Sequence, residues 1–398
     1  MPNIPSPLCK DNRRIMKHSR PLLVLQLLVL TLVSFYQLVH LSKSDIVSNK
    51  PILDIPSATC SHQTKRYPTF NVSTNKSFGA CLIIMDDNHF LTEWLAYHFL
   101  QLPLRRLIVA IDPRSSTSPT DILDRYRNRG LMKITEWQED DFMPPDMLAL
   151  HASVQEGDWE QLKALYIERQ FQFYTKCMAV LKHENITWTA LTDTDEYILP
   201  NSNANLPFRL QNTENKTIFE IIESNRRNAP MIKNGCISMH RLQFGHKESS
   251  PSQVQHMVPE GFNGTDFLTL RYRHHAGLTN SEFNKIGKCM VNLSRAKPAL
   301  DFHRSEVSSH RPIKRLCTET NMRIENQEAP FVLHHYTGSW EQWNYRNDFR
   351  PKRERENFDK IFFENDQDDS IRPWLDSFVS RYGQDLADDL LEGVGKLI

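Results

Sequence analysis

Two carboxylates, Asp193 and Asp195, are separated by one residue and follow the largely apolar stretch 187–192. Carboxylate oxygens at this spacing can bind one hard divalent cation, or the water molecules around it. Such a cation neutralises charge on a departing diphosphate, which transfer of a group from a nucleotide-linked donor requires. We therefore predict that Asp193 and Asp195 bind Mn²⁺ or Mg²⁺. The alternative is a charged turn in which Asp193 acts as a cap.

The spacing of two aspartates is weak evidence without its context. Asp366 and Asp368 show the same spacing, but they lie in a hydrophilic run with no apolar segment before it. That context predicts solvated surface. A histidine could complete a metal site, and one of His334 and His335 is a candidate because the pair follows the apolar run 331–333. An ordinary histidine remains the alternative, and the pair 274–275 is a rival.

The segments that must position these side chains alternate between short apolar runs, typical of strands, and apolar residues at helical spacing. Short apolar runs at 81–85, 104–111, 131–137 and 187–192 predict buried strands. Helices are expected at 89–101, from a cap at Ser118 to Gly130, and at 159–181, with a polar loop over 138–157. This order predicts an α/β fold with a mostly parallel sheet and ligands at the carboxyl ends of its strands. Asp112 and Asp193 stand at two such ends.

Later parts of the chain are less regular. Residues 267–272 and 289–293 read as strands, 346–365 are strongly charged, and the stretch from Ser370 has helical spacing. The glycine motifs of dinucleotide-binding and P-loop sites are absent from the sequence. Lys and Arg together number 48 and so do Asp and Glu, so the composition gives no reason to expect a nucleic-acid partner.

The N-terminal region predicts a membrane anchor. Residues 21–41 contain no charged side chain and are long enough to cross a bilayer, and five basic residues precede them. The positive-inside rule then places 1–20 in the cytosol and the rest in the lumen, as in a type II protein. Residues 42–78 read as a stem. A cleaved signal peptide is the alternative, with a shorter apolar stretch.

Two further features agree with a lumenal address in the Golgi or endoplasmic reticulum. Six N-x-S/T sequons occur, at Asn71, Asn75, Asn185, Asn215, Asn263 and Asn292. Six cysteines follow the apolar segment, at 60, 81, 177, 236, 289 and 317, and they permit up to three disulfides. Sequence does not assign the pairing. Cys81 could instead be a buried thiol in its strand.

These residues and their order resemble glycosyltransferase family 92, over about residues 80–345. The most specific pieces are D-x-D-E-Y at 193–197 and H-Y-x-x-S-x-E from His335 to Glu341. Further matching segments are 81–85, E-W-x-x-Y-H at 93–98, the strand end 108–112 with Ser115 and Ser116, Cys177, Trp188, Phe244-Gly245 and Gly287-Lys288.

The resemblance implies a GT-A nucleotide-sugar fold over 79–345, followed by an extension over 346–398. It implies metal-dependent transfer of a sugar, often galactose, from a UDP donor to a glycan or glycoprotein. Asp112 and Asp193 would contact the donor, and Asp193, Asp195 and His335 would surround the metal. Glu196 would support the site, with Lys288, Ser339 and Glu341 near the donor phosphates or the acceptor.

We expect inversion at the sugar, with a carboxylate as general base and Glu341 as its candidate. One departure from the family pattern affects the donor. After the first strand the family commonly has a basic residue and then Asn-Glu, whereas this chain has Asp86-Asp87-Asn88. This departure motivates a second hypothesis, a non-catalytic lumenal carbohydrate-binding protein on the same fold. A metal-dependent hydrolase of glycans or phosphates is a third.

Overall fold

The computed structural model describes residues 77–154, 158–227, 229–278, 282–284, 286–317, 323–345 and 354–397. They belong to a compact unit that spans Arg66–Ile398. The predicted cytosolic tail, membrane segment and nearly all of the stem lie outside these residues. Within the described ranges, no helix has the length and apolar character that a bilayer crossing requires.

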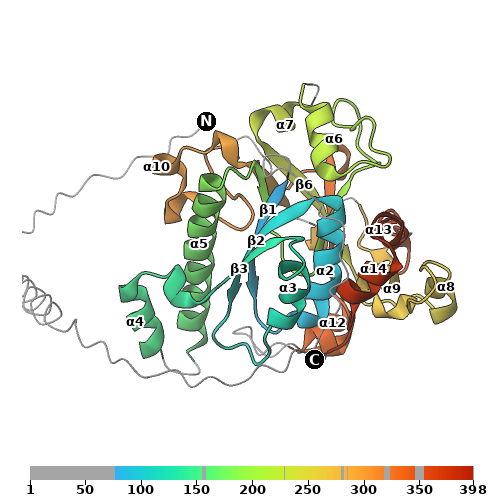
Figure 1. Ribbon diagram of the computed structural model, residues 1–398, viewed down its shortest axis with the longest axis horizontal. Helices are drawn as coiled ribbons and strands as arrows, with labels where there is room; N and C mark the ends of the chain where they lie inside the picture. The colour runs from blue at the N-terminus through green and yellow to red at the C-terminus, as the bar shows by residue number, and fades with distance from the viewer. Residues whose placement is uncertain are drawn as a thin grey trace, which may run out of the picture. The chain divides into compact units, whose positions relative to one another are not determined.

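Four parallel strands form one half of a large sheet (Figure 1). Their order is β3 (Lys133–Trp137), β2 (Leu104–Ile111), β1 (Phe78–Ile84) and β4 (Trp188–Ala190). Helices α2 (Asn88–Gln101), α3 (Thr120–Arg127) and α5 (Trp159–His183) connect them in turn. The alternating pattern thus predicts this half correctly, with ends that differ by a few residues.

The other half of the sheet is mixed. β8 (Lys288–Asn292) runs antiparallel between β4 and β6 (Cys236–Phe244). β6 continues in parallel beside β9 (Phe331–Tyr336), and β9 pairs antiparallel with β5 (Glu196–Pro200). Two short strands, β7 (His274–His275) and β10 (Asp366–Gln367), extend the edge beyond β6. The expected mostly parallel sheet is therefore a mixed α/β sheet, because the chain after β5 returns in both directions.

Successive side chains of β1 enter two different cores. Ala80, Leu82 and Ile84 pack in the core that holds α2, α13 (Trp374–Tyr382) and α14 (Gln384–Leu391). Cys81 points the other way, into the core that holds Phe173 and Leu181 of α5. This alternation makes a three-layer molecule with helices on both faces of the sheet. Helices α13 and α14 confirm the helical spacing predicted from Ser370.

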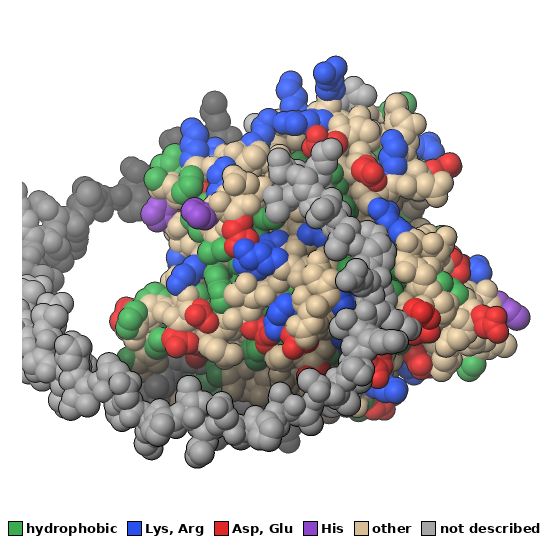
Figure 2. Space-filling model, viewed as in Figure 1, with side chains coloured by type: hydrophobic (Ala, Val, Ile, Leu, Met, Phe, Trp, Pro, Cys, Tyr) green, Lys and Arg blue, Asp and Glu red, His purple; other side chains and the backbone are tan. Residues whose placement is uncertain are grey.

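The remaining elements are short. The helices are α4 (Pro145–Ser153), α6 (Ile218–Asn225), α7 (Pro230–Asn234), α8 (Pro251–Gln255), α9 (Leu268–Arg271), α10 (Pro298–Asp301), α11 (Trp340–Trp343) and α12 (Arg355–Asp359). Single 3₁₀ turns occur at Glu139–Asp141, Gly264–Asp266, Glu282–Asn284, Leu293–Arg295, Arg304–Glu306 and Asn326–Glu328. Lys and Arg side chains gather where α6 and α7 lie, at the top of the view, and acidic side chains are scattered elsewhere on the same face (Figure 2).

Three local predictions are wrong. The expected loop 138–157 contains α4, which begins at a proline suited to a first helical turn. The expected strand 267–272 contains the helix α9, because the buried carboxylate of Glu93 accepts the backbone N–H groups of Leu268 and Thr269. α3 begins at Thr120 with Pro119 at its N-cap, while the Ser118 hydroxyl bonds only to Thr120.

Asp366 and Asp368 are not the solvated surface that the sequence predicts. Asp366 belongs to β10 and pairs with His275. Asp368 Oδ2 lies 3.7 Å from Nε2 of the fully buried His334, on strand β9. Burial lowers the pKa of His334 to about 4, although the charge of Asp368 opposes this. The hydrophilic run that contains Asp366 and Asp368 therefore forms an edge strand of the sheet and the segment after it.

Two disulfides link distant segments of the described chain. Cys81 of β1 bonds to Cys177 of α5, and Cys236 at the start of β6 bonds to Cys317. The alternative that Cys81 is a buried thiol is therefore wrong. Cys289 is buried beside the second disulfide, and Cys60 lies outside the described residues.

Candidate functional site

The turn between β4 and β5 holds the acidic cluster. The chain leaves β4 at Ala190 and enters β5 at Glu196, so Asp193 and Asp195 stand between two strands. β5 runs antiparallel to β9 with Glu196 opposite His335. The backbone N–H of Tyr336 also donates to the Asp195 carbonyl at 3.0 Å. This register brings the predicted histidine to the predicted aspartates.

Asp195 and His335 face each other across this pairing. Nε2 of His335 lies 3.5 Å from Oδ2 of Asp195. Within the described chain, Nδ1 of His335 is buried and accepts or donates no hydrogen bond. Burial of the imidazole lowers its pKa, but the charge of Asp195 outweighs this effect and raises the pKa of His335 above its ordinary value. The two groups form a polar pair at the edge of the sheet.

Lys288 joins the other two carboxylates of the cluster. Its Nζ lies 2.6 Å from Oε2 of Glu196 and 2.9 Å from Oδ2 of Asp193. Burial lowers the pKa of Lys288, but the charges of Asp193 and Glu196 dominate and raise it, so the lysine is a cation. Glu196 is 3% exposed, and its Oε2 also accepts the backbone N–H of Asp193 at 2.8 Å. Lys288 therefore sets the orientation of both carboxylates.

A glycine explains how Lys288 reaches this position. A Cβ on Gly287 would lie 1.9 Å from the backbone oxygen of Met239, so no residue with a side chain fits at this position. β8 therefore approaches β6 closely at this point, and Lys288 pairs with Met239 at the end of the ladder. In the Gly287-Lys288 pair, the glycine is therefore required by the close packing of β8 on β6, and the lysine provides the positive charge.

Two basic residues that the sequence analysis did not single out interact with the charges of the cluster. Burial lowers the pKa of Arg241 on β6, while Glu196 and the two aspartates oppose this through their charges. Burial and the nearby charge of Lys288 lower the pKa of His310, whose Nδ1 contacts the Gly287 carbonyl at 2.9 Å. Arg241 could have been found from the sequence, because a charged residue within a buried strand is unusual and indicates a functional site. His310 lies in an irregular stretch with no such signal.

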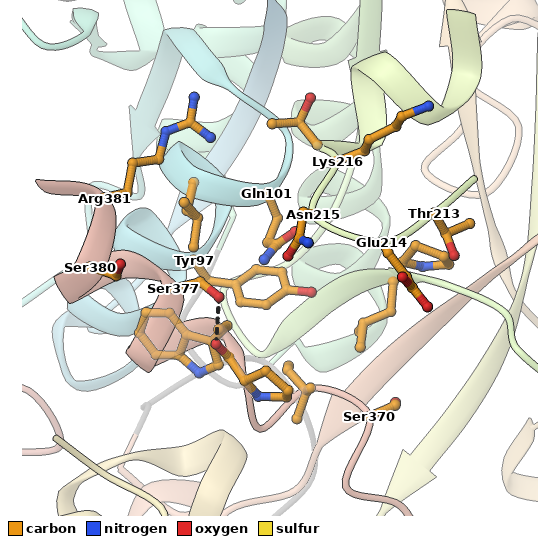
Figure 3. Close-up of a pocket in the computed structure, with 17 residues that line it drawn as sticks. Tyr97, Gln101, Thr213, Glu214, Asn215, Lys216, Ser370, Ser377, Ser380 and Arg381 are labelled. Carbon is orange, nitrogen blue, oxygen red and sulfur yellow. Dashed lines mark hydrogen bonds between the residues drawn. The ribbon is translucent and has the colours of Figure 1, made fainter. Parts of the chain in front are cut away.

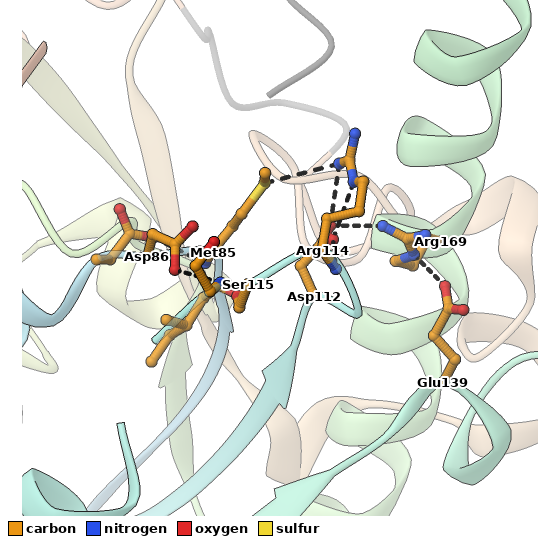
Figure 4. A network of polar contacts seen from close by, with 10 residues as sticks. Met85, Asp86, Asp112, Arg114, Ser115, Glu139 and Arg169 are labelled. Atoms are coloured by element: carbon orange, nitrogen blue, oxygen red, sulfur yellow. Dashed lines mark hydrogen bonds and ion pairs between the residues drawn. The ribbon is translucent and has the colours of Figure 1, made fainter. Parts of the chain in front are cut away.

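Asp112 lies at the end of β2 in a separate network (Figure 4). Its side chain is fully buried, and it accepts hydrogen bonds from Arg169 at 2.5 Å and from Arg114 at 3.1 and 3.2 Å. Arg169 of α5 also pairs with Glu139. Burial alone would raise the pKa of Asp112, but hydrogen bonds and charge from Arg114, with the charge of Arg169, hold it below its ordinary value. Both carboxylate oxygens are thus already used.

The segment Asp86-Asp87-Asn88 ties the loop after β1 to the loop after β2. Oδ1 of Asp86 accepts the backbone N–H groups of Ser116 and Thr117 at 2.7 and 2.8 Å, and the Thr117 hydroxyl at 2.9 Å. Asn88 Nδ2 donates to the Ser118 carbonyl at 2.9 Å. Asp86 has a positive φ of 56°, which aspartate tolerates better than most residues. Asp86 and Asn88, which depart from the family pattern, therefore stabilise the loop after β2.

Comparison with known proteins decides the family. Residues 76–370 match the profile of glycosyltransferase family 92. The chain belongs to this family. No curated protein gives a significant match. The crystal structure of TarS from S. aureus is similar, with 11% identity and a TM-score of 0.28. That similarity covers 68% of this chain and 38% of TarS, so the chain spans well under half of the TarS length.

The three metal ligands expected in this family 92 glycosyltransferase are unequally placed. Asp195 and His335 meet, whereas Asp193 is turned toward Lys288. Over the ranges that the structure describes, Cys236, Cys289 and Cys317 are the one trio of potential ligands with donor atoms within 4.8 Å of one another. Two of those cysteines form a disulfide. The Asp195 carboxylate and Nε2 of the His335 imidazole, 3.5 Å apart, are chemically suited to a divalent ion.

Ser339 and Glu341 lie at the start of α11. The Ser339 hydroxyl accepts the backbone N–H of Gln342 at 3.2 Å and so caps this helix. Glu341 is exposed; a hydrogen bond with its own backbone and one with Ser339 lower its pKa, and the charges of Arg355 and Arg271 add to this. The rival pair 274–275 forms β7. The charge of His275 lowers the pKa of His334, so His275 interacts with His334 and not with the acidic cluster.

Proposed function

We propose that this chain is a metal-dependent glycosyltransferase that moves a sugar from a nucleotide-sugar donor to a hydroxyl of a glycan or glycoprotein. A UDP-sugar is the donor class and galactose the first sugar to test. The observation that carries the proposal is the meeting of Asp195 with His335 beside the ion-paired Lys288. Family membership supports the reaction class.

The acidic and basic residues of the cluster would have different roles. Asp195 and His335, with Asp193 beside them, would hold Mn²⁺ or Mg²⁺, and such an ion stabilises a departing diphosphate as a Lewis acid. Lys288 fixes Asp193 and Glu196 and offers a buried positive charge beside the same place. Arg241 and His310 add donors on the strand and loop next to it. Preorganised groups of this kind stabilise developing charge most effectively where water is excluded.

The proposed course of the reaction is inversion. A carboxylate would take the proton of the acceptor hydroxyl while the bond between the sugar and the diphosphate breaks. Glu196 is buried and paired with Lys288, so its part is to hold the cluster. Glu341 is exposed at the start of α11 and stays the candidate base; its lowered pKa keeps it ionised at neutral pH but also makes it a weaker base.

We further propose a GT-A fold and a single-pass, type II location in the Golgi or endoplasmic reticulum membrane, with residues 21–41 as the anchor. The two disulfides support an oxidising compartment. Three sequon asparagines, Asn185, Asn215 and Asn263, are exposed, so an attached glycan would meet solvent.

Release of UDP tests the proposal. The purified full chain should release UDP from a UDP-sugar when Mn²⁺ and a glycan acceptor are present. Asp195→Ala and chelation by EDTA should each abolish this release, and Asp376→Asn, at an exposed position of α13, should leave it unchanged. Release that survives both treatments would contradict the role of the metal.

A second candidate is a lumenal glycan-binding protein without catalysis. The observation that favours it is the engagement of both Asp112 oxygens with Arg114 and Arg169, at the place where a donor contact is expected. Calorimetry separates the two functions. Binding of glycan without binding of UDP and Mn²⁺ would favour the second candidate, and binding of UDP only with Mn²⁺ would favour the enzyme.

A further inference from the structure

A cavity of about 600 Å³ lies at the end of β5 that is remote from Glu196 (Figure 3). Its walls come from three elements: Gln101 of α2, the loop 213–217, and α13 with Ser377 and Arg381. Its size falls within the usual range for small-molecule sites. It shares no residue with the acidic cluster, so the proposed sugar transfer does not account for it.

Asn215 is part of the lining of this cavity and begins the sequon Asn215-Lys216-Thr217. Its backbone has a positive φ of 55°, which asparagine adopts more readily than most residues. Its side chain is exposed, and Gln101 lines the same cavity (Figure 3). In the described part of the chain its side chain makes no hydrogen bond, so a glycan on Nδ2 would break no contact of the folded protein.

The other sequons differ from this one. Asn292 is 5% exposed, and its Oδ1 accepts the backbone N–H and the hydroxyl of Ser294. Asn263 is exposed, but its Nδ2 donates to Oδ1 of Asp266 at 3.1 Å. Asn185 is exposed, directly after α5, and does not line the cavity. The two remaining sequons lie outside the described residues.

We propose that Asn215 carries an N-linked glycan whose first N-acetylglucosamine units occupy this cavity. The acetamide and hydroxyls of such sugars need hydrogen-bond partners, which Gln101, Ser377 and Arg381 supply around the space. Pro200 and Pro373 add apolar surface for the ring faces. The proposal rests on the lumenal location of the proposed function, because the modification requires that compartment.

The glycan is transferred from a lipid-linked diphosphate oligosaccharide. The bond between Nδ2 and sugar C1 forms, the bond between C1 and the phosphate oxygen breaks, and the amide loses one proton. In the folded chain the Thr217 hydroxyl donates to Glu220 at the cap of α6. The sequon hydroxyl is therefore engaged once the loop has folded, and transfer precedes folding of this loop. The bound sugars then fill the space between α2 and α13.

Mapping of glycan sites is the first test. The full chain is expressed in eukaryotic secretory cells, and glycans are released enzymatically in heavy-oxygen water, which labels each modified asparagine. We expect label at Asn215 and Asn185. Label at Asn185 alone overturns this proposal but leaves the lumenal location standing. Absence of label at all six sequons overturns this proposal and the lumenal location together.

Release of the glycan from the native protein tests whether it occupies the cavity. We expect the Asn215 glycan to be released about tenfold more slowly than the Asn185 glycan, as one or two hydrogen bonds would give. The double substitution Gln101→Ala and Arg381→Ala should remove the difference, and Asp376→Ala, outside the cavity lining, should preserve it. Equal rates in the unsubstituted protein overturn the docking. Asn215→Gln should leave UDP release unchanged, so this test is independent of the proposed catalysis.

Discussion

Nε2 of His335 lies 3.5 Å from Oδ2 of Asp195, longer than an ordinary hydrogen bond, and the pairing of β5 with β9 fixes both residues there. Two ligands of one ion have this kind of separation, so the proposed metal would be held between them. His335→Ala should lower sugar transfer at least about 100-fold and raise the Mn²⁺ concentration needed for half-maximal rate, because ligand loss weakens metal binding. Titration of UDP release with Mn²⁺ measures both.

The control for this prediction is His303→Ala. His303 is exposed, and its Nε2 contacts the Ala299 carbonyl at 2.7 Å. That variant should titrate with Mn²⁺ like the unsubstituted chain. If His335→Ala keeps the Mn²⁺ dependence and loses only rate, then His335 acts on the substrate instead of the metal.

Lys288 and Glu196 are both almost fully buried, at 4% and 3% exposure of their side chains. Removal of one partner leaves a buried charge without its counterion, which costs about 3–5 kcal/mol. Lys288→Met should therefore lower the free energy of unfolding by this amount, as urea titration measures. Adding Glu196→Gln should recover a large part of the loss.

The exposed pair Lys360 and Glu356 provides a matched control for this cycle. Lys360→Met should change the free energy of unfolding by less than about 1 kcal/mol, because solvent screens exposed ion pairs. If the double substitution at Lys288 and Glu196 is no more stable than Lys288→Met, the two side chains are not coupled as the distances indicate.

Asp86 uses a single oxygen to hold the loop after β2. All three hydrogen bonds from Ser116 and Thr117 end on Oδ1. Asp86→Ala removes them, so the loop that precedes α3 loses its anchor, and we expect the donor KM to rise about tenfold with a smaller change in kcat. Asp86→Asn keeps an oxygen acceptor and the tolerance of a positive φ, and it should behave like the original residue. Equal kinetics for all three proteins would show that this loop does not affect the donor.

The sequence predicted the parallel half of the fold because each strand there is a short apolar run with a helix of clear periodicity after it. Asp193 and Asp195 were placed correctly after the end of a strand for the same reason, whereas the strand that follows them, β5, was not predicted. The mixed half was harder, since its order depends on pairings between residues far apart, such as Glu196 with His335 and Asp366 with His275. No local pattern records such pairings.

Other differences arise where a buried group decides local structure. The run 267–272 is apolar enough for a strand, yet Glu93 from α2 caps it as a helix. Asp368 lies in a hydrophilic run, yet it faces the buried His334. Asp112 stood at a strand end as expected, but its two arginine partners come from the next loop and from α5. Contacts of this kind depend on tertiary structure, which the spacing of residues does not encode.

Glu93 gives a pH dependence whose sign follows from its burial. Burial raises its pKa from 4.5 to about 7, although bonds from Thr269 and Leu268 lower it. Between these pH values the folded state binds the proton that the unfolded state has lost. Stability from this group is therefore present below pH 4.5 and is lost as pH rises toward 7, by on the order of 3 kcal/mol. Glu93→Gln cannot ionise, so its free energy of unfolding should fall less than that of the unsubstituted protein over this range. Urea titrations at several pH values measure the two slopes, and parallel curves would show that Glu93 ionises in the fold as readily as in the unfolded chain.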